Sequence, residues 1–342
     1  MRKLSVLLLA AVILASCATT YPATHGKKTE KVMIAYVYNP REMPDPTYLT
    51  HINYAFGHVS DSFNSVRIEN PDKLRGIVAL KKQYPYLKVI LSIGGWGSGN
   101  FSEMAADPEL RMAFCKDCKR ITEEFGLDGI DIDWEYPTSN SAGISCSPDD
   151  TENYTLLMRD LRSVLGPKKL LTHATVSEAE FIDYVAVNQY VDFTNVMTYD
   201  CGWPPYHNAP LYESSNGPGR LSVSASIEKY LALGVPADKL VMGVPFYGHA
   251  IEGFPRVKDM AKAHEIPGYT YHWDEVACVP YLTDNRTGQY AYGYENEESL
   301  RLKTEYALSK NLKGIMYWDY KGDTPDGTFR KLIYLILNPG RK

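Results

Sequence analysis

The sequence predicts an α/β fold in which eight parallel strands alternate with helices and close into a barrel. Short apolar runs alternate with amphipathic helical stretches along most of the chain, and the apolar runs number eight. This alternation also suits a doubly wound open sheet, but eight is the number of strands that closes a barrel. The chain has 342 residues. One such barrel commonly takes about 250 residues or more, so no second domain is needed.

Each predicted strand is a short run rich in aliphatic, β-branched and aromatic residues. The strands cover residues 32–38, 52–59, 88–93, 129–135, 170–176, 194–199, 240–246 and 314–318. Helices are predicted between them by apolar residues at helical spacing. The clearest sets are Leu74, Ile77 and Val78; Tyr154, Leu157 and Leu161; and Ile227, Tyr230 and Leu231. Gly234 after the third set is a helix stop, and Asp107 with Pro108 forms a cap and a first turn.

The longest interval between predicted strands covers residues 251–313 and exceeds an ordinary strand-to-helix loop. Many of its aromatic residues alternate as they do in short strands. They are Tyr269, Tyr271, Trp273, Tyr281, Tyr290, Tyr292 and Tyr294. We therefore expect a short insertion, residues 251–296, between strands seven and eight.

Residues 128–135 read DGIDIDWE and place three carboxylates in strict alternation. Side chains two apart on a strand share a face, so Asp131, Asp133 and Glu135 are expected to project together. Like charges held this close raise the pKa of a neighbouring carboxyl, as acid catalysis requires. A solvated strand face or a cation site is the plainer alternative. Apolar neighbours on both sides of the acids argue against it.

Four segments resemble, in order, the sequence motifs of glycoside hydrolase family 18, the chitinases. They are residues 92–96 (SIGGW), 127–137 (LDGIDIDWEYP), 197–200 (MTYD) and 316–319 (MYWD). The agreement extends over about residues 31–338. It implies a TIM (β/α)8 barrel as the catalytic domain, residues 31–342.

The resemblance implies retaining hydrolysis of β-1,4-linked N-acetylglucosamine in chitin or chito-oligosaccharides, without a metal or nucleotide cofactor. In this family the 2-acetamido carbonyl of the substrate attacks the anomeric carbon, an exception to the usual carboxylate pair. Glu135 would act first as general acid and then as the base that activates water. Asp133 would bind the acetamido N–H, and Asp131 would share a proton with Asp133. Tyr199 would donate to the acetamido oxygen.

Barrel active sites lie at the C-terminal ends of the strands, where further family positions fall. The matching substrate-binding residues are Tyr36, Ser92, Gly95, Trp96, Asp200 and Trp318. Tyr36 and Ser92 match positions around the inner Asp131. Trp318 would form the floor of the subsite of the cleaved sugar, and Trp96 would stack on the leaving-group side. A tryptophan at a strand end can also be a simple barrel plug, and this alternative stays open for Trp96.

The chain departs from the family pattern in two places. His249 stands where family members often have arginine. The interval at 251–313 is short for the insertion that commonly walls one side of the cleft. We therefore expect a shallower groove.

The N-terminus predicts export and lipidation. Arg2 and Lys3 precede an apolar run, residues 4–14, that is too short to span a bilayer, so residues 1–16 are interpreted as a signal peptide. Residues 14–17 (LASC) resemble a bacterial lipobox, in which Cys17 becomes the acylated first residue; ordinary cleavage after Ala18 is the alternative. Residues 17–30 would then be a tether, and we expect a lipid-anchored protein of the bacterial cell envelope.

The net charge and the number of cysteines limit the classes of partner and the disulfides that this chain can have. The net charge of -5, with 23% charged residues, gives no basic field for nucleic acid and is compatible with a neutral polysaccharide. Apart from Cys17 there are five cysteines, an odd number that excludes full internal pairing. Cys118 lies in a predicted helix and is expected to face the hydrophobic core. A disulfide between Cys146 and Cys201 stays open. We expect a monomer.

Two rival functions remain at this point. The first is an endo-β-N-acetylglucosaminidase acting on N-glycans, and against it stand Trp134, Trp318 and the MTYD segment. The second is a chitin-binding lectin, which typically lacks the acid, whereas Glu135 is present here. The absence of a visible chitin-binding module favours soluble oligosaccharides over crystalline chitin.

Overall fold

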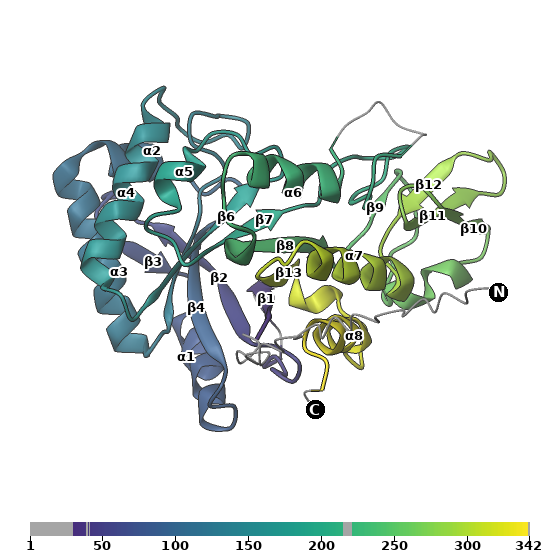
Figure 1. Ribbon diagram of the computed structural model, residues 1–342, viewed down its shortest axis with the longest axis horizontal. Helices are drawn as coiled ribbons and strands as arrows, with labels where there is room; N and C mark the ends of the chain where they lie inside the picture. The colour runs from purple at the N-terminus through teal and green to yellow at the C-terminus, as the bar shows by residue number, and fades with distance from the viewer. Residues whose placement is uncertain (1–29, 39, 41, 215–220, 341–342) are drawn as a thin grey trace, which may run out of the picture. The chain divides into compact units, whose positions relative to one another are not determined.

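The computed structural model describes residues 30–38, 40, 42–214 and 221–340 of the chain (Figure 1). The predicted signal peptide, Cys17 and all of the tether except Glu30 lie outside these residues, so the predictions about them stay predictions. No helix within the described ranges combines the length and apolar character needed to cross a bilayer.

Eight parallel strands form a closed barrel, which confirms the predicted fold class. They are β1 (Val32–Tyr38), β2 (His51–Val59), β4 (Lys88–Gly94), β5 (Gly129–Asp133), β6 (Leu170–Val176), β7 (Phe193–Met197), β8 (Leu240–Pro245) and β13 (Gly314–Trp318). The sheet runs in the order β1-β13-β8-β7-β6-β5-β4-β2, and β1 also pairs with β2. This last pairing closes the barrel. The short β3 (Val66–Ile68) pairs antiparallel with β2 outside the ring.

Two strands, β5 and β7, end two residues earlier than the sequence predicts. The ladder between β4 and β5 stops at Gly94 and Asp133, where the Asp133 carbonyl accepts a hydrogen bond from the Gly95 N–H at 2.8 Å. Trp134 and Glu135 therefore leave the strand before the alternation is complete. β7 likewise ends at Met197, two residues short of the predicted end.

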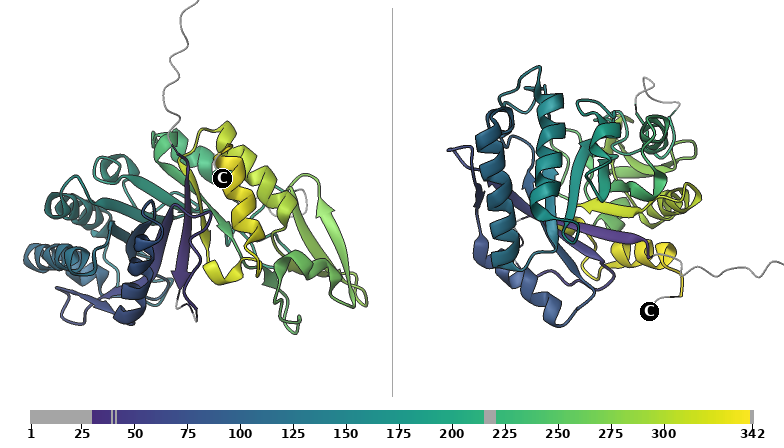
Figure 2. Two further views of the ribbon diagram at one scale, coloured as in Figure 1. Left: turned by 90° about the horizontal axis from the view of Figure 1, so that it is seen from below. Right: turned by 60° about the vertical axis from the view of Figure 1, so that its left-hand side comes forward.

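Helices lie outside the strands (Figure 2). They are α1 (Pro71–Ala79), α2 (Phe101–Ala106), α3 (Pro108–Phe125), α4 (Asp150–Leu165), α5 (Tyr184–Val187), α6 (Val223–Ala232), α7 (Glu297–Ser309) and α8 (Thr328–Leu337), with 3-10 turns at Leu80–Lys82, Ala237–Lys239, Met260–Glu265 and Tyr320–Gly322. Asp107 caps α3 as predicted, since its carboxylate accepts from the N–H groups of Glu109 and Leu110.

The cysteines of α3 face the core. Cys118 is fully buried, as predicted, and Cys115 is buried beside it. Burial raises the pKa of the Cys115 thiol to about 12, so this sulfur remains a protonated core group. The five cysteines in the described part of the chain are unpaired, so Cys146 and Cys201 are not joined.

Between β8 and α7 the chain forms a small antiparallel sheet, which Figure 1 shows beside the barrel. Its strands are β9 (His249–Ala250), β10 (Tyr269–Asp274), β11 (Val279–Asp284) and β12 (Tyr290–Gly293), in the order β10-β11-β12-β9. β9 follows the barrel strand β8 after three residues. His249 is therefore held between the barrel mouth and this sheet.

Candidate active site

The C-terminal ends of the barrel strands surround a cleft of about 850 Å³. Eight of the ten predicted site residues within the described ranges line it. They are Tyr36, Gly95, Trp96, Asp133, Glu135, Tyr199, Asp200 and Trp318. The other two, Asp131 and Ser92, are fully buried and do not line the cleft.

Asp131 is fixed by four hydrogen bonds. Its Oδ2 accepts from the hydroxyls of Tyr36 at 2.9 Å and Ser92 at 2.8 Å. Its Oδ1 accepts from the Thr172 hydroxyl at 2.5 Å and the Asn195 amide at 3.1 Å. Tyr36 and Ser92 lie where the family resemblance implies, whereas Thr172 and Asn195 were not predicted. Polar residues inside the otherwise apolar strands β6 and β7 were the available signal.

With both oxygens of Asp131 occupied, no hydrogen bond joins Asp131 to Asp133 in the described arrangement. The shared proton that the resemblance implies stays a prediction. The charge of Asp131 acts on Asp133 through space. Burial, then the charges of Glu135 and Asp131, hold the pKa of Asp133 well above its usual range.

The Asp133 carboxyl faces the cleft with an unused acceptor. The residue is 4% exposed, and no donor in the described part of the chain reaches its Oδ1. A buried polar oxygen without a partner is costly, by about 1–3 kcal/mol. An N–H group of a bound ligand would remove this cost.

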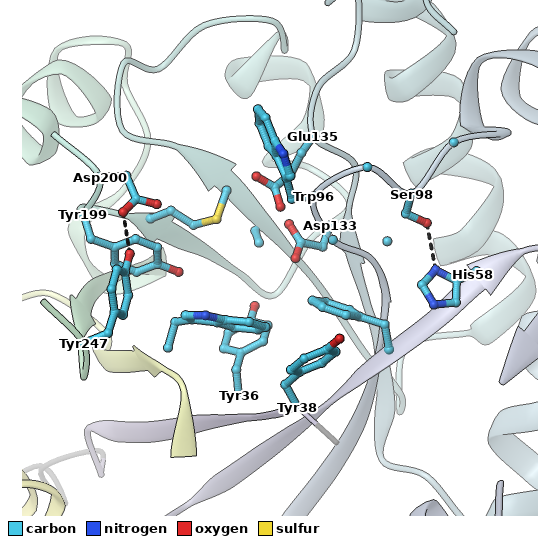
Figure 3. A pocket seen from close by; sticks show the side chains of 18 of the residues that line it. Tyr36, Tyr38, His58, Trp96, Ser98, Asp133, Glu135, Tyr199, Asp200 and Tyr247 are labelled. Carbon is cyan, nitrogen blue, oxygen red and sulfur yellow. Dashed lines mark hydrogen bonds between the residues drawn. The ribbon is translucent and has the colours of Figure 1, made fainter. Parts of the chain in front are cut away.

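Glu135 lies beyond the end of β5 and has the properties of a proton donor. Burial raises its pKa to about 7, a hydrogen bond from Tyr136 partly opposes this, and the charge of Asp200 adds to it. Figure 3 shows the carboxyl groups of Glu135 and Asp133 turned into the cleft, with Tyr199 and Asp200 on one side. A carboxyl with this pKa is suited to give a proton and take it back near neutral pH.

The pH profile of kcat/KM tests this assignment. An acid catalyst must be protonated in the free enzyme, so kcat/KM should fall about tenfold per pH unit as the pH rises above about 7, the pKa of Glu135. Hydrolysis of a chromogenic N-acetylglucosamine oligomer over pH would measure it. An alkaline limb near 4.5, the ordinary glutamate value, would contradict the raised pKa.

Tyr199 follows β7 and points its hydroxyl toward the carboxyls. Among the described residues that hydroxyl makes only a weak contact, to the Met316 sulfur at 4.0 Å. Burial, then the charge of Asp133, raises the pKa of Tyr199 well above its usual range, so the hydroxyl keeps its proton. Tyr199 thus has a donor available for a ligand acceptor.

Aromatic rings form the floor and walls of the cleft. Trp318 packs nearly parallel to Phe56, with ring centroids 5.7 Å apart, and lies 5.8 Å from Tyr38. Trp96 is 64% exposed, which excludes the barrel-plug alternative for this residue. Trp203 also lines the cleft and is 63% exposed. Flat apolar faces of this kind are suited to stack on sugar rings.

Sequence reasoning missed Tyr38, Phe56, Trp203 and Tyr247 in this lining. Tyr38 closes β1, and Tyr247 follows β8 by two residues, so both occupy strand ends that the barrel prediction could have singled out. Trp203 lies in a loop, and no residue pattern marked it.

Gly95 is required by close packing at the cleft edge. Its φ is +92°, and a Cβ there would come within 2.7 Å of the Phe56 ring. A Cβ on the neighbouring Gly94 would collide with the Asp133 carbonyl. The two glycines therefore let the end of β4 approach both the aromatic floor and the acid-bearing strand.

The cleft is organised around carboxyls and hydroxyls. In the part of the chain that the structure describes, no group of three or more His, Cys, Asp or Glu side chains is arranged to hold a metal ion. The barrel mouth with a proton-donating carboxyl, a buried second carboxyl and stacking aromatic rings has the features of a carbohydrate-cleaving site.

Comparisons with known proteins agree with this class. The model of the glycosyl hydrolases family 18 matches residues 21–323, and the chain belongs to this family of glycosidases. Chitinase A1 of Niallia circulans is 34% identical, over 71% of this chain and 42% of the relative. Probable chitinase 2 of Drosophila melanogaster is 30% identical, over 94% of this chain and 78% of the relative. The chain thus spans less than half of the first relative.

The chain also resembles solved structures of enzymes from this family. A glycoside hydrolase family 18 N-acetylglucosaminidase from Paenibacillus barengoltzii superposes with a TM-score of 0.81 at 32% identity, covering 90% of this chain and 99% of that one. A Group IV chitinase of Ostrinia furnacalis, in complex with allosamidin, superposes with a TM-score of 0.81 at 27% identity, covering 92% and 100%.

Proposed function

We propose that this chain hydrolyses β-1,4-linked N-acetylglucosamine in chitin or chito-oligosaccharides, with retention and by substrate-assisted catalysis. The observation that carries the proposal is the trio at one point of the cleft. Burial raises the pKa of Glu135 to about 7. Within the described residues, Asp133 Oδ1 accepts no hydrogen bond, and the Tyr199 hydroxyl has only the Met316 sulfur as a hydrogen-bond partner. An acid, an N–H acceptor and an O–H donor are the three groups that an acetamido-bearing sugar needs.

In the first step Glu135 gives its proton to the glycosidic oxygen, and the bond from that oxygen to the anomeric carbon breaks. The acetamido carbonyl oxygen forms the new bond to this carbon, which closes an oxazolinium ring. Asp133 accepts from the acetamido N–H and stabilises the positive charge, and Tyr199 donates to the carbonyl oxygen and holds it in place.

In the second step the Glu135 carboxylate takes a proton from water, whose oxygen attacks the anomeric carbon. The oxazolinium ring opens, the acetamido group is restored, and Glu135 regains its proton. Two inversions at one carbon give net retention. Trp318 lies under the sugar that carries the reaction, and Trp96 stacks on the leaving-group side.

Short soluble oligosaccharides are the proposed substrates. The relative from Paenibacillus barengoltzii, matched over 99% of its length, is an N-acetylglucosaminidase, and this supports action on small substrates. The sheet from β9 to β12, with strands of two to six residues, forms only a small wall beside the barrel.

Product analysis tests the substrate class. Chito-oligosaccharides of defined length and a high-mannose glycoprotein would be incubated with the protein and the products weighed by mass spectrometry. Shortened oligosaccharides with an intact glycoprotein are expected. Release of the N-glycan would establish the endo-β-N-acetylglucosaminidase alternative, and binding without any cleavage would establish the lectin.

We also propose that the protein is held at the bacterial cell envelope through acylated Cys17. Cys17→Ala should move it from the membrane to the soluble fraction, because lipid chains add about 0.8 kcal/mol of membrane binding for each buried CH₂. Fractionation with a salt wash and immunodetection would measure this, with Cys146→Ala as the matched control. A mutant that stays with the membrane would contradict the lipobox.

A further inference from the structure

A second cavity, of about 340 Å³, lies beside the cleft and has a basic lining. Its charged side chains are Arg256 and Lys258, from the segment after β9, and Lys321, from the 3-10 turn after β13. None of the described residues that line it is an aspartate or a glutamate. The net charge of the chain is -5, so three cations without a carboxylate run against the overall balance. We call this cavity the basic pocket.

The basic pocket adjoins the cleft. Three residues of the segment that follows β8 line both cavities: Tyr247, Gly248 and Ala250. On the other side, Lys321 Nζ lies 5.1 Å from the centre of the Tyr38 ring. Tyr38 lines the cleft and lies 5.8 Å from Trp318. A group attached to a sugar chain above Tyr38 and Trp318 would therefore meet Lys321 first.

Packing fixes the segments that carry these cations. Phe254 stacks on Tyr292 of β12, with ring centroids 4.8 Å apart, and Met260 is buried. The chain is thus anchored on both sides of the first two cations. Gly322 brings the turn of the third cation against the segment after β8, because a Cβ there would collide with the Phe246 carbonyl oxygen. The walls of the basic pocket are therefore preformed.

The three cations have no anionic partner. In the ranges that the structure describes, the side chains of Arg256, Lys258 and Lys321 form no ion pair and no hydrogen bond. The carboxyl that lies near Lys321 is that of Asp319, outside the lining. Burial raises the pKa of Asp319, and the charge of Lys321 opposes this without a direct pair. Cations that face a cavity in this way are suited to an anionic ligand, because hydrogen bonds between charged groups are the strong ones.

We propose that the basic pocket binds a carboxylate carried by a sugar next to the cleaved N-acetylglucosamine. The substrates would then include acidic chains, such as one in which N-acetylglucosamine alternates with N-acetylmuramic acid, whose lactyl ether carries a carboxylate. The planar guanidinium of Arg256 matches the two oxygens of that group, and Lys258 and Lys321 add positive charge. This inference rests on the proposed function and names a substrate class for the same cleft.

Two tetrasaccharides of alternating N-acetylglucosamine and N-acetylmuramic acid are the matched probes. One has free lactyl carboxylates, and in the other these are converted to amides of nearly the same shape. Calorimetric titration of the Glu135→Gln protein measures binding without turnover. The carboxylate form should bind about tenfold more tightly than the amide form at low salt. Added salt should reduce this ratio, because it screens the charges.

Removing two of the cations should abolish the preference. In the same protein, Arg256→Gln combined with Lys258→Gln should bring the two affinities to within about twofold of each other. Lys262→Gln is the matched control and should keep the tenfold ratio, since Lys262 is exposed and does not line the basic pocket. A variant that fails to fold would lose both affinities, and the ratio and its salt dependence before these substitutions would still decide the proposal.

Equal binding of the carboxylate and amide forms would overturn the proposal, and so would a preference that survives the double substitution. Inorganic phosphate that binds while the two tetrasaccharides bind equally would mean that the pocket holds a free anion instead. The proposed function fails separately. A chain with Glu135 intact that cleaves neither chitotetraose nor the acidic tetrasaccharide would contradict the hydrolysis, whereas the binding ratio would still establish the basic pocket.

Discussion

Glu135→Gln should lower kcat by at least a hundredfold while the protein still binds chito-oligosaccharides. The amide occupies the same volume but has no proton to give, and general acid catalysis contributes about 10²–10⁴-fold. Because Glu135 lies beside Asp133, the substitution also removes a charge that raises the pKa of Asp133. Binding of the N–H group by Asp133 is therefore expected to persist or improve.

Initial rates on chitotetraose and calorimetric titration of the same oligosaccharide would measure the two effects separately. Glu252→Gln, at an exposed glutamate, is the matched control and should leave both unchanged. A Glu135→Gln protein that keeps more than about a tenth of the native kcat would remove Glu135 from the role of the acid.

Substrates that lack the N-acetyl group on the sugar at the cleavage point should be inert, although Glu135 is intact. The reaction then has no nucleophile, since the acetamido carbonyl supplies it, and Asp133 and Tyr199 lose their ligand groups. A thiazoline that mimics the bicyclic intermediate should inhibit competitively. Tyr199→Phe, which removes the donor to that group, should lower kcat by about ten- to a thousandfold.

Matched pairs of acetylated and de-acetylated chitobiose derivatives, assayed at equal concentration, would give the comparison. De-acetylated substrates that turn over at similar rates would mean that a carboxylate of the protein is the nucleophile. The retaining mechanism with a covalent glycosyl intermediate would then replace the substrate-assisted one.

The barrel could be predicted from the sequence because each strand is a local apolar run and its partner is the next strand along the chain. Strand ends were harder to place, as at Asp133, where a hydrogen bond from Gly95 ends the ladder before Glu135. β3 was missed because its three residues are half-exposed or exposed and give no periodic signal.

The residues of the site also differ in whether the sequence could identify them. Residues within recognisable motifs, such as Asp133 and Tyr199, could be assigned from sequence. Thr172 and Asn195 could not, because their role depends on where β6 and β7 place them around a carboxylate more than 40 residues away. The stack of Trp203 on His249 joins a loop residue to the first residue of β9 and has no local pattern at all.

The buried carboxyls at the end of β5 also affect how this chain can evolve. Burial raises the pKa of Asp133 above its value in an unfolded chain, so the ionised carboxyl costs folding free energy, and the cost grows as the pH rises from the unfolded to the folded pKa. Replacing such a group by its neutral amide relieves that cost. Mutations of this carboxyl that abolish the chemistry are therefore expected to increase the free energy of unfolding. Because the aromatic cleft would remain, such mutations would produce inactive descendants that can still bind sugar.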